Sequence, residues 1–206
     1  MQVTDVIFYI AILIMSVVIH EVSHGFVAEY FGDKTARLAG RLTLNPLKHL
    51  DPVGSILLPI ALYITSGFAF GWAKPVPYNP DNLSNRKWGT IAVAGAGVSA
   101  NFLIAVIFGL IIRFSSSFTL SLDFYFITSS IVIINLALAI FNLIPIPPLD
   151  GSKILFSLLP YSLYPVIDFI ERYGFFFLIF FVIVFSEYLV YPILAYLFTL
   201  ITSLAF

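Results

Sequence analysis

The run Val6–Phe31, VIFYIAILIMSVVIHEVSHGFVAEYF, is the part of the sequence from which the architecture follows. A helix needs about 20 predominantly apolar residues to cross a bilayer, and this run is long enough. It differs from an ordinary spanning helix because His20, Glu21 and His24 lie in its C-terminal half. Ionisable side chains at membrane depth are costly and usually face a functional interior. The run therefore predicts a membrane helix that carries a polar site.

The composition of the whole chain places it among membrane proteins. Of its 206 residues, 60% are hydrophobic and 10% are charged, and the mean hydropathy is +1.03. Soluble domains have about 25% charged residues, so these charges are too few to cover a water-exposed surface. This excludes a soluble enzyme and a disordered chain. The net charge of −1 also gives no basic surface for a polyanion, so we expect no nucleic-acid partner.

The N-terminal residues and the absence of cysteine indicate which kind of membrane protein this is. The N-terminal MQVTDVIFYI has no positively charged segment before its apolar run, which predicts a retained membrane helix rather than a removable signal peptide. The chain has no cysteine, so a metal would have to be held by histidine and carboxylate side chains. Because no internal repeat or soluble appendage is visible, we expect one membrane-embedded domain over residues 1–206.

Five further apolar runs follow the first. Residues 91–112 and 124–146 are long enough to span, and the tail holds two more candidates at 166–186 and 188–206. The run 53–66 has only 14 residues and fits a re-entrant segment better than a full crossing. The sequence thus predicts an all-α polytopic membrane protein with about five transmembrane helices and a short re-entrant segment.

The basic residues support the same topology. The loop after the first helix contains Lys34, Arg37, Arg41 and Lys48, and the loop before residue 91 contains Lys74, Arg86 and Lys87. Loops rich in lysine and arginine remain in the cytoplasm. Both loops can be cytoplasmic only if residues 53–66 enter and leave the membrane on the same side. The N-terminus then lies on the outer side of the membrane.

The loop at 67–90 alternates aromatic and small residues and is interrupted by glycine and proline. This pattern predicts an extended, membrane-associated β-hairpin over residues 67–80. An aromatic anchor at the membrane interface is the alternative interpretation.

His20-Glu21-Val22-Ser23-His24 has the H-E-x-x-H pattern. Residues four apart share one face of a helix, so the two imidazoles can reach a single Zn²⁺. Glu21 lies beside the first ligand, where it can take a proton from the attacking water and later deliver it to the leaving amine. The alternative is a polar cluster that serves helix packing.

A zinc site normally has a third protein ligand, and the candidates are His49 and Asp150. His49 lies in a loop beyond the helix end, whereas Asp150 ends the proline-rich stretch Asn142–Gly151. With a re-entrant 53–66, the 124–146 helix runs from outside to inside. Asp150 then arrives on the cytoplasmic side, near the two histidines.

At this point the chain resembles the site-2 protease family of intramembrane zinc metalloproteases, in its short prokaryotic form without a PDZ or CBS domain. The resemblance rests on His20–His24, on Asn142–Gly151 and on Gly-Trp-Ala-Lys-Pro-Val-Pro at 71–77. It implies one Zn²⁺ per chain, held by His20, His24 and Asp150, with Glu21 as general base. It further implies a catalytic core at about 1–155, followed by C-terminal helices at about 156–206.

The resemblance also implies that Asn142 positions the substrate or stabilises the oxyanion, as an amide donor can; a helix-terminal cap is the alternative. Ala96–Asn101 is similar to the family's Ala-Gly-Pro-x-x-Asn, with Val98 in place of proline. We expect Asn101 to make an interhelical hydrogen bond rather than to act in catalysis.

The expected function is hydrolysis of transmembrane substrate helices at the cytoplasmic side of a prokaryotic cell membrane. We expect Gly71, Trp72 and Lys74 of the hairpin to help bind the unwound substrate strand. A divalent-metal transporter and a non-catalytic membrane adaptor are the alternatives. No repeat of the kind that transporters use is visible, and an intact Glu21 argues against the adaptor.

Overall fold

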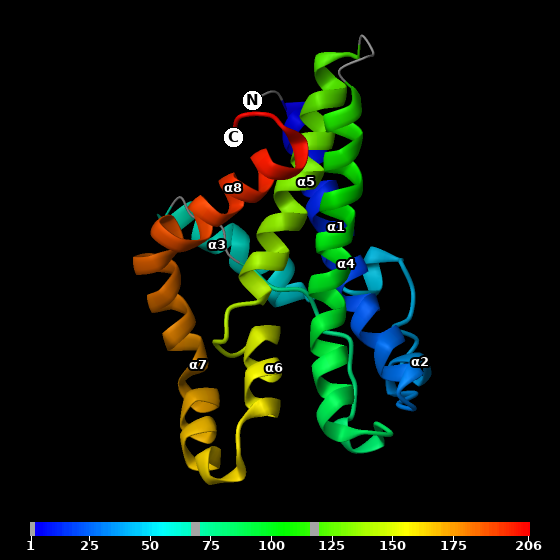
Figure 1. The fold of residues 1–206 in the computed structure, drawn as a ribbon, viewed down its shortest axis with the longest axis vertical. Coiled ribbons are helices and arrows are strands. Elements are labelled where there is room, and N and C mark those ends of the chain that lie inside the picture. Colours follow the sequence, from blue (N-terminus) through cyan, green and yellow to red (C-terminus); the bar gives the residue numbers. More distant parts are fainter. Residues whose placement is uncertain (1–2, 67–70, 116–119) are drawn as a thin grey trace.

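The computed structural model describes residues 3–66, 71–115 and 120–206 and contains helices and connecting segments but no β-strand among them (Figure 1). Three long helices form the centre: α1 (Val3–Tyr30), α4 (Arg86–Phe114) and α5 (Leu122–Asn142). The other helices are α2 (Thr35–Leu38), α3 (Leu58–Ser66), α6 (Asp150–Leu158), α7 (Tyr164–Phe185) and α8 (Tyr191–Thr202).

The central helix is α4, which packs against both α1 and α5, and these two helices also contact each other. The main apolar cluster lies where α4 and α5 meet α8, and it includes Ala105, Val132, Leu136, Leu194 and Phe198. Small residues such as Ala105 let membrane helices approach closely. The last helix therefore shares its core with the helices that carry the site.

Among the described residues, four helical segments are long and apolar enough to cross a membrane: Thr4–Tyr30, Arg86–Phe114, Leu122–Asn142 and Tyr161–Thr202. The sequence predicts five transmembrane helices, because Glu187 separates two apolar runs in the tail. In the structure Glu187 lies in a π-helical turn, Ser186–Val190, that joins α7 to α8 without a loop. The two predicted tail spans consequently form one continuous helical segment of 42 residues.

The segment that connects α1 to α4 starts and finishes at the same end of the helix bundle. The Ser84 N–H donates to the Phe31 carbonyl at 2.7 Å, so the start of α4 lies beside the end of α1 (Figure 1). In between, the predicted re-entrant run forms a π-helical turn, Pro52–Leu57, followed by α3. This return is the arrangement expected if residues 53–66 do not cross.

The predicted β-hairpin over 67–80 is not seen. Residues 67–70 lie outside the described residues, and residues 71–79, here called the strap, are extended but pair with no strand. Their N–H groups donate instead to scattered acceptors: Trp72 to Gly54 O at 3.0 Å and Lys74 to His49 O at 2.8 Å. Proline at 75 and 77 removes further donors, so a β-ladder cannot form.

Asp33, in the turn after α1, anchors the far end of the strap. It is fully buried and accepts hydrogen bonds from the Asn79 N–H at 2.6 Å and the Asn82 amide at 2.9 Å. Thr35 donates to it through both its N–H and its hydroxyl. Burial alone would raise the pKa of Asp33, but these hydrogen bonds favour the charged form and hold its pKa below the usual value.

Replacing Asp33 with asparagine should destabilise the protein by about 1–3 kcal/mol, because buried donors lose a charged acceptor. The lowered pKa means that the stabilisation is present above the unfolded-state pKa of about 3.9 and is lost as the pH falls through the folded-state pKa. The gap in melting temperature between wild type and Asp33→Asn in detergent should therefore narrow between about pH 6 and pH 3. Asp81→Asn, at an exposed side chain, is the control; a gap independent of pH would contradict the assignment.

Candidate active site

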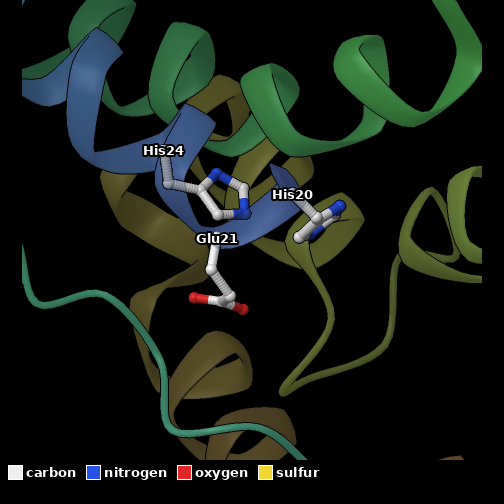
Figure 2. Close-up of side chains that lie close together, drawn as sticks. All are labelled: His20, Glu21 and His24. Atoms are coloured by element: carbon white, nitrogen blue, oxygen red, sulfur yellow. The ribbon is translucent and has the colours of Figure 1, made fainter. Parts of the chain in front are cut away.

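His20 and His24 lie on the buried face of α1, and their imidazole rings are 4.7 Å apart (Figure 2). One turn of helix separates them, which is the reason both rings point to the same place. Asp150, the first residue of α6, meets them there. Its Oδ2 lies 3.0 Å from His20 Nε2 and 3.1 Å from His24 Nε2.

The other ring nitrogens fix the tautomers. His20 Nδ1 is 2.6 Å from the Asn101 side-chain oxygen, and His24 Nδ1 is 2.6 Å from the Val93 carbonyl. Both partners are oxygen acceptors, so each Nδ1 carries the hydrogen and donates it. In the neutral imidazoles both Nε2 atoms are then left with bare lone pairs, directed at Asp150.

The orientation of the Asn101 amide is set independently. Its nitrogen donates to Asn135 Oδ1 at 2.7 Å and to the Ser16 carbonyl at 3.3 Å, so its oxygen has to face His20. Asn101 and Asn135 are both completely buried. The interhelical hydrogen bond predicted for Asn101 is present, and the same side chain also orients His20.

This donor set fits zinc. Two imidazole lone pairs and a carboxylate oxygen converge within 3.1 Å, an arrangement that repels itself unless a cation lies between the donors. Zinc bound tetrahedrally at about 2.0–2.1 Å places neighbouring ligand atoms only about 3.3 Å apart. A small relaxation would accommodate the ion.

Asp150 is held in place by its surroundings. A Cβ on Gly151 would collide with the Leu143 backbone, so glycine lets α6 begin directly against the end of α5. On the far side of the carboxylate, Lys153 Nζ is 3.1 Å from Oδ1. The ammonium group of Lys153 favours the ionised form of the Asp150 carboxylate, which is the form that binds a metal.

Glu21 points from α1 toward the strap (Figure 2). Its Oε2 accepts a hydrogen bond from the Val76 N–H at 2.8 Å. The ligand atoms of His20, Glu21 and His24 all lie within 4.8 Å of one another, so Glu21 is close enough to act on water at the metal position. Arg41 supports this contact by donating to the Lys74 carbonyl at 2.6 Å and to that of Pro75 at 3.2 Å.

These groups surround a cavity of about 130 Å³. Its lining comes from α1, α4, α5, α6 and the strap, and comprises His20, Glu21, His24, Pro75, Val76, Tyr78, Val93, Ala94, Asn142, Pro148, Asp150 and Lys153. Asn142 lies at the end of α5, where its amide donates to the Leu138 carbonyl at 2.9 Å. The predicted His20, Glu21, His24, Asn142 and Asp150 are thus brought together.

Other predicted residues lie outside the cavity. Gly71, Trp72 and Lys74 belong to the strap but do not line the cavity, which the strap instead reaches through Pro75, Val76 and Tyr78. His49 is buried elsewhere, with Nε2 2.8 Å from the Thr43 carbonyl.

Sequence reasoning missed several supporting groups: Ser16, Val93, Asn135 and Lys153. A backbone carbonyl such as Val93 O gives no sequence signal. Asn135 gives one, because it is a polar residue inside an apolar span, where side-chain amides commonly hydrogen-bond between helices. Lys153 lies one helical turn after the predicted ligand Asp150.

A histidine pair and a carboxylate inside a bundle of apolar helices, with a second carboxylate beside them, define a membrane-embedded metallohydrolase site. Comparison with known proteins agrees. A family model described as "Peptidase family M50" matches residues 117–185. The Bacillus subtilis protein named "Putative zinc metalloprotease YwhC" is 39% identical over 191 residues, covering 88% of this chain and 83% of that protein.

Two further relatives are more distant. "Putative zinc metalloprotease Rip2" of Mycolicibacterium smegmatis is 31% identical over 70% of this chain and 54% of that protein. "Zinc metalloprotease MJ0392" of Methanocaldococcus jannaschii is 28% identical over 72% of this chain and 33% of that protein. No solved structure matches the chain significantly. The chain belongs to peptidase family M50, the site-2 protease family, and is a zinc metalloendopeptidase.

Gly97 on α4 supplies the flat surface on which the His20 ring lies. A Cβ at this position would be 2.6 Å from His20 Nε2 and Cε1, whereas a Cβ at Gly95 would meet nothing within 4 Å. Gly97→Ala should therefore displace the imidazole and weaken zinc binding by about 10–100-fold, as supporting-residue changes typically do. Zinc affinity by chelator competition measures the effect, with Gly95→Ala as the matched control; equal affinities for the two variants would refute the packing argument.

Proposed function

We propose that the protein hydrolyses peptide bonds of transmembrane substrate helices at the cytoplasmic side of the membrane. The observation that carries this proposal is the convergence of His20, His24 and Asp150, with Glu21 beside them, in a small cavity between membrane helices. Metal-dependent peptide-bond hydrolysis needs a metal position, a base and space for water, and the cavity offers all three.

His20 Nε2, His24 Nε2 and Asp150 Oδ2 are the proposed zinc ligands. Zinc, when bound, supplies a Lewis acid that polarises the scissile carbonyl and lowers the pKa of water. The hydrogen bonds from His20 to Asn101 and from His24 to Val93 hold the rings in the ligating tautomer. Asp150 contributes a negative charge that partly neutralises the metal.

Glu21 is the proposed general base. Its carboxylate takes a proton from the attacking water and delivers it to the nitrogen of the leaving amine, which can then depart. The Val76 N–H engages Oε2, which leaves Oε1 as the oxygen that receives the proton. This hydrogen bond also restrains the rotamer of Glu21 against the cavity.

Asn142 is the proposed oxyanion donor. A side-chain amide has two N–H groups, and the Leu138 carbonyl accounts for one of them. The second N–H is available to the cavity that Asn142 lines. The bond to Leu138 therefore fixes the amide, as a cap would, without exhausting its capacity to bind the developing negative charge.

Substrate has to reach the cavity as an extended chain, because helix carbonyls are tied into internal hydrogen bonds. The strap lies over Glu21 and is the proposed contact for that chain. Trp72 and Lys74 have N–H groups already bonded to Gly54 and His49. Backbone pairing of a substrate strand with residues 71–74 would have to use the other edge of the strap, so Trp72 and Lys74 could contact the substrate only through their side chains. Gly71, Trp72 and Lys74 stay predicted substrate contacts.

The proposed orientation places the N-terminus outside a prokaryotic cell membrane. The basic loop residues Lys34, Arg37, Arg41 and Lys48 follow α1, and Arg86 and Lys87 open α4; the ends of these helices meet at the same end of the bundle (Figure 1). By the positive-inside rule that end is cytoplasmic. We propose a single domain, with a core at 1–155 and the C-terminal helices at 156–206 packed on it, whose partners are membrane proteins or peptides and the lipid bilayer.

Glu21→Gln should reduce cleavage by about 10²–10⁴-fold, because glutamine cannot accept the proton. Zinc content should remain that of the wild type. The assay is cleavage of a fluorogenic transmembrane peptide by the purified protein in proteoliposomes, together with metal analysis. Glu29→Gln is the matched control, since Glu29 pairs with Arg37 at the end of the same helix, away from the cavity. Undiminished cleavage by Glu21→Gln would rule out the assigned role, and metal uptake without any cleavage would favour a transporter.

Asn142→Ala should lower kcat by about 10²–10³-fold, the usual effect of removing one oxyanion donor. KM and zinc content should change little, because the amide acts mainly on the transition state. Steady-state kinetics on the same peptide, with thermal melting measured in parallel, test this. A lowered melting temperature with unchanged kcat would instead identify Asn142 as a helix-terminal cap only.

A further inference from the structure

Lys153 is a lysine of the cavity wall to which the proposed mechanism gives no task. It lies one helical turn after Asp150 on α6, and its Nζ is 3.1 Å from Asp150 Oδ1. The same Nζ is 6.0 Å from the centre of the Tyr78 ring in the strap. The ammonium thus contacts the Asp150 carboxylate and lies near the Tyr78 ring, while the Lys153 side chain is 42% exposed. Among the described lining residues it is the only lysine or arginine.

The carboxylate of Asp150 has two different oxygens in this arrangement. Oδ2 faces the Nε2 atoms of His20 and His24, at 3.0 and 3.1 Å. Oδ1 faces Lys153. Since an ammonium donates strongly to a carboxylate oxygen, the contact opposes rotation of the carboxylate toward the histidines.

The different partners of Oδ1 and Oδ2 matter because zinc accepts a limited number of ligands. Catalytic zinc sites have three protein ligands and keep the fourth position for water or substrate. His20, His24 and one oxygen of Asp150 supply three. If both oxygens of Asp150 were bound, the protein itself would fill the fourth position and no place would remain for the attacking water.

We propose that Lys153 is a positioning residue that reserves Oδ1 of Asp150, so that Asp150 binds zinc through Oδ2 alone and one coordination position stays open. The inference rests on the proposed zinc site. A simple ion pair on a helix surface would give stability and nothing else. The placement of Lys153 in the cavity, against one specific oxygen of a proposed ligand, gives it the additional role.

The test compares purified, zinc-loaded wild type with Lys153→Met, Lys153→Arg and Lys153→Gln. Lys48→Gln, at an exposed lysine that does not line the cavity, is the matched control. X-ray absorption fine structure at the zinc edge distinguishes the two binding modes. A two-oxygen carboxylate adds an oxygen neighbour and brings its carbon closer to the metal. Zinc content, thermal melting and cleavage of the fluorogenic peptide are measured on the same samples.

Lys153→Met should retain zinc, show two-oxygen coordination by Asp150 and lose about tenfold or more in kcat, within the range reported for supporting residues of metal sites. Lys153→Arg, which keeps a charged donor, should retain the one-oxygen spectrum of the wild type. If Lys153→Met does not fold, Lys153→Gln takes its place, since it keeps the stem but loses the charge.

Two results would overturn the inference. One is an unchanged zinc spectrum in Lys153→Met and Lys153→Gln. The other is a loss of zinc that follows a loss of thermal stability while the remaining metal is bound as in the wild type, because this is what a purely structural ion pair predicts. A wild type that binds no zinc would refute the proposed function itself, so the two failures are distinguishable.

Discussion

The rest of the site depends on the meeting of two bare imidazole nitrogens and one carboxylate oxygen inside a bundle of apolar helices. Such an arrangement is unfavourable without a cation, and polar groups at this depth are costly unless each of their remaining atoms has a partner. The surrounding helices meet that requirement. Asn101 and Val93 on α4 hold the two outer ring nitrogens, and Asn135 on α5 holds Asn101 in turn. This chain of hydrogen bonds links α1, α4 and α5, and it requires α4 to pack closely against the other two.

The base is held in a different way from the ligands. Glu21 lies on the same helix as the histidines, but its partner is the backbone of the strap, which no strand supports. The strap is fixed at separate points by Asp33 and Arg41, both in the loop after α1. An extended substrate that enters the cavity has to compete with the strap for the space beside Glu21. The proposed ligands His20 and His24 are thus held by buried contacts with α4, whereas the strap beside Glu21 is held by a few hydrogen bonds from the loop after α1.

Much of this could be predicted from the sequence, because the decisive signals are local. Periodicity and length identify the long helices, and H-E-x-x-H predicts two histidine ligands on one helix face with a base beside them. The placement of the basic residues, combined with the short run at 53–66, predicts that Asp150 lies on the same side of the membrane as His20 and His24. The predicted β-hairpin is not seen in the described part of 67–80. Alternation of aromatic and small residues does not provide a partner strand, and Pro75 and Pro77 remove donors that a β-ladder needs. The sequence predicts two spans in the tail, whereas the structure has one continuous helical segment there. Glu187 lies inside a helical turn, and hydropathy alone cannot distinguish a charged residue within a helix from one in a loop between two helices. Val93 O and Lys153 depend on tertiary contacts that leave no pattern in the chain.

The small residues of α4 show why the sequence motif and the metal site are one feature. Gly97 is four residues before Asn101, so both face α1 on successive turns. The glycine lets the His20 ring lie flat on α4, and the asparagine then meets its Nδ1. A larger residue at 97 would push the ring outward and break the hydrogen bond even with Asn101 unchanged. Valine at 98 is compatible with this geometry, because it directly follows Gly97 and its side chain leaves α4 in another direction from the Gly97 position against which the His20 ring packs. The spacing of Gly97 and Asn101, rather than a proline between them, is what the site requires.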